Sequence, residues 1–109
     1  MEEWKDIKTF EGKYQVSNYG RVRNIQTNHI LTQGLRPNGY YQVTLWRKKY
    51  DGVTRTVHKL VAETFITNPL NLPQVNHKDH NRLNNCVENL EWCSAKYNSN
   101  HKRNNRKPL

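Results

Sequence analysis

Turn-forming residues interrupt the first half of the chain at short intervals, which leaves no room there for a long helix. They are Glu11-Gly12, Asn18-Tyr19-Gly20, Gln33-Gly34, Pro37-Asn38-Gly39 and Asp51-Gly52. Between them lie short runs rich in Val, Ile, Tyr and Thr, the residue types that favour strands. We therefore predict that residues 1–56 form a twisted antiparallel sheet.

The clearest predicted strand in this sheet spans residues 40–46, where side chains alternate between two faces. One face of that strand carries Tyr41, Val43 and Leu45. A hairpin turn at Asp51-Gly52 should pair the strand with residues 54–57.

After residue 56 the spacing of apolar residues changes to that of a helix. A stripe at i, i+3, i+4 and i+8 is formed by Val57, Leu60, Val61 and Phe65. Asn68-Pro69 should end this helix, and His58 at its start is assigned a capping or packing role. Residues 90–93 then indicate a short strand, and Ser94 can cap a helix over residues 95–103. The chain is therefore predicted to be an α+β protein.

The charge of the chain limits its partners. It has 109 residues, enough for one compact domain or two small modules, and a formal net charge of +9. Such a charge favours nucleic acid or an acidic membrane as partner. No apolar run approaches the roughly 18 residues that span a bilayer, and the first residues are acidic, unlike a signal peptide. We therefore expect a cytoplasmic protein.

The large aromatic and sulfur-containing side chains are first interpreted as core. A chain this small must bury large apolar groups to be stable, which assigns Trp4, Trp46 and Trp92 to the interior. Cys86 and Cys93 are expected to be small, buried thiols, because the cytosol is reducing.

The most informative pattern is Asn76-His77, followed by Asn89 after eleven residues and Asn98 after eight more. It resembles the HNH endonucleases, specifically the phage intron-type homing endonucleases. The matching text is Val75-Asn76-His77-Lys78-Asp79, Asn84-Asn85 and Glu88-Asn89-Leu90-Glu91-Trp92. Residues 3–7, 14–23 and 57–62 are similar to the family as well. The resemblance implies an N-terminal sheet module over 1–56 and an HNH nuclease module with a basic tail over 57–109, the latter containing a ββα-metal unit at about 73–103.

The resemblance also implies a role for each residue of the pattern. His77 would be the general base, which suits an imidazole because its pKa lies near neutral pH. Asn76 and Asn98 would supply oxygen ligands to a divalent metal, Mg²⁺ or Mn²⁺, that stabilises charge on the phosphate. Asn89, in the loop between the strands, would brace the backbone around His77.

Two positions depart from the family pattern. Asn76 stands where the family often has Asp, so metal affinity without DNA should be weak. His80 stands where a turn glycine is common, which makes it a second candidate base or ligand. His101, on the predicted final helix, could also approach the phosphate. Structural zinc is not expected, because the spacing of the nearby His and Cys residues matches no familiar zinc motif.

The expected partner is double-stranded DNA, and binding to a membrane is not expected. The residues predicted to contact DNA are Arg21, Arg23, Lys59, Arg82, Lys102 and Arg103. One ββα unit should nick DNA unless two chains cooperate, and it should leave 5′-phosphate and 3′-hydroxyl ends. Related homing endonucleases usually continue into a C-terminal DNA-binding region that these residues lack. We therefore expect either a free-standing small nuclease or one whose specificity comes from a partner, as a homodimer or with another protein. The alternative is a DNA-binding module that uses the HNH unit only as scaffold.

Overall fold

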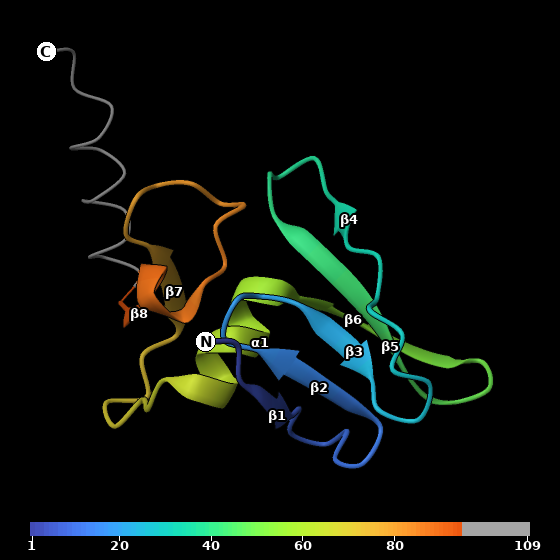
Figure 1. Cartoon of the computed structure of the whole chain (residues 1–109). Helices are drawn as coiled ribbons and strands as arrows, with labels where there is room; N and C mark the ends of the chain where they lie inside the picture. Colours follow the sequence, from blue (N-terminus) through green and yellow to red (C-terminus); the bar gives the residue numbers. More distant parts are fainter. Residues whose placement is uncertain (95–109) are drawn as a thin grey trace, which may run out of the picture.

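Three small antiparallel sheets and one α-helix make up residues 1–94, the part of the chain that the computed structural model describes (Figure 1). The first sheet contains β1 (Trp4–Asp6), β2 (Tyr14–Ser17) and β3 (Val22–Asn24). The second contains β4 (Gly34–Leu35), β5 (Tyr41–Lys48) and β6 (Asp51–Thr56). Helix α1 (Val57–Phe65) follows, and the third sheet pairs β7 (Gln74–His77) with β8 (Leu90–Cys93), which a short 3-10 helix, η1 (Val87–Asn89), precedes. The α+β class is as predicted.

The single sheet predicted for residues 1–56 is wrong, because the structure divides this region into two sheets. After β3 the chain turns away at Asn24, whose Oδ1 accepts hydrogen bonds from the backbone N–H groups of Gln26 and Thr27. Asn28 then adopts a left-handed conformation with φ 59°. Only an isolated bridge between Arg23 and Ile30 continues the pairing. A side chain that caps its own backbone competes with strand pairing, which explains the break.

The β5–β6 hairpin forms as predicted, but its turn lies two residues earlier than expected. Lys48 pairs with Asp51, so Lys49 and Tyr50 form the turn, with Tyr50 at φ 65°. Asp51 and Gly52 therefore belong to β6. A shift in register between Trp46 and Lys48 absorbs the difference.

Trp46 is 49% exposed, so its assignment to the core is wrong. The alternation along β5 explains this result, since Val43 and Leu45 are buried and Trp46 falls on the opposite face. Its ring covers Gly52 instead, where a Cβ atom would lie 2.8 Å from the indole Cζ3. Trp4 and Trp92 are half-buried.

Helix α1 lies between the two N-terminal sheets and the β7–β8 hairpin (Figure 1). Its predicted apolar stripe is correct: Val57, Leu60 and Val61 are buried. The helix ends at Phe65, before Asn68-Pro69. One continuous core joins it to every sheet, through residues such as Ile7, Val16, Leu45, Val75 and Leu90. The division into modules at residues 56 and 57 stays a prediction.

The strand predicted over residues 90–93 is confirmed as β8. The predicted helix over 95–103, with Asn98, His101, Lys102 and Arg103, lies outside the described residues. Within residues 1–94, no helix has the length and apolar character needed to cross a bilayer.

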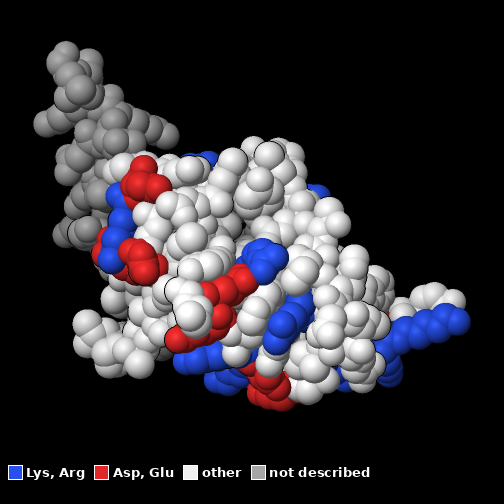
Figure 2. All heavy atoms as spheres, in the orientation of Figure 1, with Lys and Arg blue, Asp and Glu red and all other residues white. Residues whose placement is uncertain are grey.

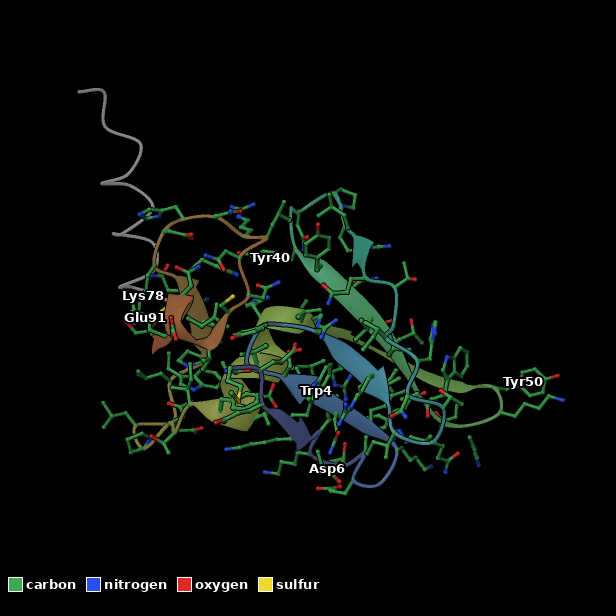
Figure 3. All side chains as sticks on the ribbon, in the orientation of Figure 1. Trp4, Asp6, Tyr40, Tyr50, Lys78 and Glu91 are labelled. Carbon is green, nitrogen blue, oxygen red and sulfur yellow. The ribbon has the colours of Figure 1, made fainter. Side chains whose placement is uncertain are left out.

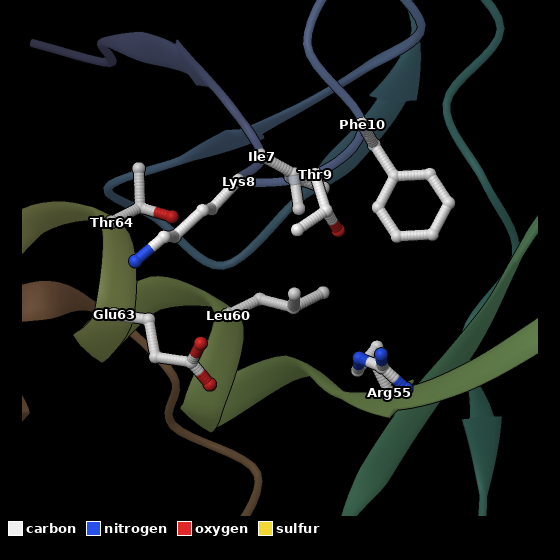
Figure 4. Close-up of a pocket in the computed structure, with 8 residues that line it drawn as sticks. All are labelled: Ile7, Lys8, Thr9, Phe10, Arg55, Leu60, Glu63 and Thr64. Carbon is white, nitrogen blue, oxygen red and sulfur yellow. The ribbon is translucent and has the colours of Figure 1, made fainter.

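A shallow hollow lies between the β1–β2 loop and α1 (Figure 4). Ile7, Phe10 and Leu60 contribute apolar atoms to it, and Lys8 and Glu63 contribute charged groups. None of the predicted site residues within 1–94 lines it.

Candidate active site at the end of strand β7

His77 is the last residue of β7 and is only 4% exposed. Side chains alternate along a strand, so it shares the core-facing side of β7 with Val75. Its Nε2 lies 2.8 Å from Oδ1 of Asn85. An amide oxygen can only accept a hydrogen bond, so Nε2 carries the hydrogen and Nδ1 is the unprotonated nitrogen of the neutral ring.

Two further rings contact His77 from elements far apart in the sequence. Tyr40, just before β5, stacks on His58 of α1 with ring centroids 4.6 Å apart and an interplanar angle of 23°. The centroid of His77 lies 5.2 Å from that of His58 and 5.9 Å from that of Tyr40. The guanidinium of Arg82 covers Tyr40 at 5.1 Å. We call Tyr40, His58, His77, Arg82 and Asn85 the imidazole cluster.

Burial keeps both histidines of the imidazole cluster neutral. It lowers the pKa of His58 to about 4, with smaller contributions from the nearby His77 and Lys59. Burial also lowers the pKa of His77, although the Asn85 hydrogen bond and the charge of Asp79 oppose this shift. A neutral His77 at pH 7 is able to accept a proton.

Asn89 closes the loop between β7 and β8. Its Nδ2 donates to Oδ1 of Asp79 and to the carbonyl of Asn84, both at 2.9 Å. Its Oδ1 accepts from the backbone N–H of Asp79 at 3.1 Å. Hydrogen bonds from Asn84, the Asn81 backbone and Asn89 lower the pKa of Asp79. These contacts fix the chain immediately after His77.

His80 adopts the left-handed conformation, with φ 63°, which glycine adopts most readily. It is exposed, whereas His77 is buried. The two candidate bases therefore occupy different environments.

Asn76 faces the opposite side of the hairpin from His77. It is 6% exposed, pairs across the strands with Glu91, and donates from Nδ2 to the Glu91 carboxylate at 2.9 Å. Figure 3 shows Glu91 on the side of the hairpin away from Tyr40. Asn98, the other predicted ligand, lies outside the described residues. In residues 1–94 no three His, Cys, Asp or Glu side chains converge as metal ligands.

Four of the predicted DNA-binding residues lie in the described part of the chain, where they are spread over several elements and do not form one cluster. Arg21 donates from Nε to Glu2 at 2.9 Å, while Arg23 bonds Gln15 and lies 4.3 Å from the Trp4 ring. Figure 2 shows acidic and basic groups interspersed on this face, with basic atoms also at the tip of the β5–β6 hairpin.

Two more of these residues have different settings. Lys59 is exposed on α1. Arg82 belongs to the imidazole cluster and donates to the carbonyl of Asn38 at 2.6 Å. Only Arg82 of the described set therefore contacts that cluster directly.

The sequence pattern identified His77 and Asn89 but missed Tyr40 and Asn85 as parts of the site. Asn85 lies in a segment that resembles the family, but the spacing of the residues does not indicate its hydrogen bond to His77. The sequence pattern marks Tyr40 only as a strand residue. His58 was assigned packing or capping; the structure shows it packed, without a side-chain cap at the helix start.

Comparison with known proteins places this geometry in context. Residues 2–46 match the NUMOD4 motif. The chain is 45% identical over 98 residues to the uncharacterised HNH endonuclease L245 of Acanthamoeba polyphaga mimivirus, covering 90% of this chain and 29% of that protein. It is 43% identical over 96 residues to the DNA endonuclease I-HmuI of Bacillus phage SP01, covering 88% of this chain and 55% of that protein.

A solved structure, described as DNA binding and cleavage by the HNH homing endonuclease I-HmuI, has the same fold. It matches with a TM-score of 0.84 and 39% identity, over 98% of this chain and 62% of that one. The chain thus spans less than two thirds of each of these proteins. Along nearly all of its own length, the chain is similar in sequence and in fold to the HNH homing endonuclease I-HmuI.

Proposed function

We propose that the chain is a DNA endonuclease that hydrolyses phosphodiester bonds, with His77 as its general base. The observation that carries this proposal is the setting of His77 at the end of β7. There it is neutral, held through Nε2 by Asn85, and followed by a loop that Asn89 fixes. The likeness to I-HmuI, a named DNA endonuclease, supports the choice of substrate.

In the proposed reaction, Nδ1 of His77 takes a proton from the water that attacks the phosphorus atom. The imidazolium that forms keeps its Nε2 hydrogen bond to Asn85, whose carbonyl oxygen stabilises the positive charge. Because His77 is only 4% exposed, few water molecules can contact it. The 3′ oxygen departs with the electrons of the P–O bond and takes a proton from water to become the 3′-hydroxyl, and His77 later releases its own proton to solvent.

We propose that a divalent metal is held at Asn76, the neighbour of His77 in β7. Asn76 donates through Nδ2, which leaves its amide oxygen as a hard ligand, and Asn98 would supply the second oxygen. The carboxylate of Glu91 beside Asn76 adds negative charge. When bound, the metal would stabilise charge on the phosphoryl oxygens and on the departing oxygen. We propose Mg²⁺ as that ion, with Mn²⁺ as an alternative.

The remaining proposals concern the substrate and the assembly. Arg21, Arg23, Lys59, Arg82, Lys102 and Arg103 are the proposed DNA contacts. One His77 per chain gives a nick with 5′-phosphate and 3′-hydroxyl ends, and two chains or a protein partner would be needed for a double-strand break.

Plasmid cleavage tests this function, with DNA affinity measured in parallel. We expect nicking with Mg²⁺ or Mn²⁺, none with EDTA, and a loss of about 10²- to 10⁴-fold in rate for His77→Ala with affinity within a few-fold. His80→Ala is the matched control and should cut normally. Normal cutting by His77→Ala but not by His80→Ala would assign the base to His80.

A second candidate is a DNA-binding module without useful nuclease activity. The neutral Asn76, in place of the family's frequent Asp, favours it. Tight binding of plasmid with no cleavage under any metal would establish this alternative.

A further inference from the structure

A turn of the first sheet packs directly against the residue that holds His77. The turn follows β2 and contains Asn18, Tyr19 and Gly20, while the segment it contacts runs from Asn85 to Val87. The Asn18 carbonyl accepts a hydrogen bond from the Val87 N–H at 2.8 Å. The N-terminal region and the β7–β8 loop are therefore joined through backbone at this point.

Gly20 makes the closest approach in this contact. It is buried, and a Cβ atom placed on it would lie 2.9 Å from Cβ and 3.0 Å from the carbonyl oxygen of Asn85. No side chain fits there unless Asn85 shifts, and Asn85 is itself only 5% exposed. The backbone of Gly20 thus forms one wall of the site that holds Asn85.

The turn is itself fixed from behind. The Ser17 hydroxyl, fully buried, accepts from the backbone N–H groups of Tyr19 and Arg21, both at 3.1 Å. Gln33 donates from Nε2 to the Gly20 carbonyl at 2.7 Å. These hydrogen bonds hold the wall in place independently of the β7–β8 loop.

We propose that the N-terminal region positions the general base: the turn at Gly20 holds Asn85 so that its amide oxygen stays on Nε2 of His77. Gly20 and Asn85 are positioning residues, since neither would touch the reacting atoms. The role rests on the proposed function of His77. It gives the NUMOD4-matching region a part in the chemistry, because residues 17–20 lie within that motif.

Displacement of Asn85 should change which nitrogen of His77 carries the hydrogen. With Asn85 in place, Nε2 is protonated and Nδ1 is available as base. Without that acceptor the neutral ring is a mixture of both tautomers. Positioning contacts of this kind are worth about 10- to 100-fold in activity.

The experiment compares Gly20→Ala with Gly12→Ala in the full chain. Both glycines have positive φ, 84° and 80°, so both substitutions strain the backbone, but a Cβ at Gly12 meets nothing within 4 Å. The first readout is the ¹⁵N spectrum of the His77 ring above pH 7, which reports the tautomer without any cleavage. The second is single-turnover nicking at saturating DNA.

Gly20→Ala should give a tautomer mixture and nicking slowed about 10- to 100-fold, while Gly12→Ala keeps the wild-type spectrum and rate. In the Gly20→Ala, Asn85→Ala double variant the rate should match that of Asn85→Ala alone, because the contact acts only through Asn85. Losses that multiply, or an unchanged His77 spectrum in Gly20→Ala, would overturn the proposal.

If Gly20→Ala does not fold, Ser17→Ala tests the same wall, since it removes the hydroxyl that shapes the turn and adds no atom. The same tautomer mixture is expected, and a wild-type spectrum would contradict the proposal. A wild-type protein that fails to nick DNA would refute the proposed function, while the ring spectra would still decide whether Gly20 controls His77.

Discussion

The two sides of the β7–β8 hairpin differ in how much of the chain holds them. The His77 side is enclosed by Tyr40 near β5, His58 of α1 and Asn85 of the loop. On the other side, Asn76 bonds Glu91 of the neighbouring strand. Residues separated widely in sequence therefore fix the proposed base, whereas contacts within one hairpin set the described part of the proposed metal side.

This difference between the two sides indicates which part of the site is already ordered in the free protein, before DNA binds. The orientation and neutral state of His77 are properties of the folded protein. An amide oxygen is a weak ligand for Mg²⁺, so the proposed metal would depend on the phosphate for further negative charge. Ion and DNA should then bind with positive coupling.

The largest expected effect concerns the His77 side of the hairpin, where buried His58 should make the stability of the protein depend on pH. His58 is 8% exposed, and its pKa falls from 6.5 in the unfolded chain to about 4 in the folded protein. Its neutral form is favoured by folding, so its contribution is complete above pH 6.5 and declines as pH falls toward 4. Between pH 7 and pH 4, protonation of His58 should lower the free energy of unfolding by about 3 kcal/mol.

Urea unfolding at pH 7 and pH 4.5 measures this effect. His58→Phe should remove most of the pH-dependent loss of stability, while His29→Phe, at an exposed position, should keep it. An equal loss in wild type and His58→Phe would mean that His58 is not buried in its neutral form.

Asn89→Ala should have the next largest effect, because the loop after His77 depends on it. The substitution removes three hydrogen bonds, to the Asp79 carboxylate, the Asp79 N–H and the Asn84 carbonyl. We expect a loss of about 1–3 kcal/mol in the free energy of unfolding. Asn84→Ala, which removes one side-chain bond to Asp79, is the control and should cost less. Equal losses in the two variants would show that Asn89 does not brace the loop.

The smallest expected effect tests the side of Asn76. Asn76→Asp places a carboxylate beside Glu91, so the free protein should lose stability through like-charge repulsion. The same change should strengthen Mg²⁺ binding without DNA about tenfold. Titration calorimetry with Mg²⁺ checks this prediction. The double variant Asn76→Asp, Glu91→Gln is the control, because it carries the new carboxylate at position 76 without changing the net charge. Tight Mg²⁺ binding by wild type that survives Asn76→Ala would place the metal on other residues.

Local patterns predicted the elements of this fold well. The apolar stripe from Val57 located α1, and the apolar residues of 90–93 located β8, because burial on one face leaves a periodic signal. The break at Asn24 is not predicted from the sequence. It depends on hydrogen bonds between the Asn24 side chain and the backbone that follows, and a strand-like sequence pattern does not reveal such bonds. The hairpin turn was misplaced for a similar reason, as Tyr50 has no glycine-like signature for its positive φ.

The site was predictable only where it is local in sequence. His77 and Asn89 lie at the two ends of the single loop that joins β7 to β8, so their separation in the sequence is fixed. The resemblance of this segment to the family therefore identified both residues. Tyr40 and Gly20 reach the site through tertiary packing, and no spacing rule connects residue 20 to residue 85. Such contacts become visible only once the three sheets are assembled around α1.

The pH dependence of single-turnover DNA nicking tests the role of His77 most directly. Burial lowers the pKa of His77 below its ordinary 6.5, and the base must be unprotonated to act. The rate should therefore rise with pH to a plateau, with a midpoint below 6.5, and the residual rate of His77→Ala should lack this step. The same midpoint in His77→Ala, or a wild-type midpoint at or above 6.5, would contradict the assignment of His77 as the general base.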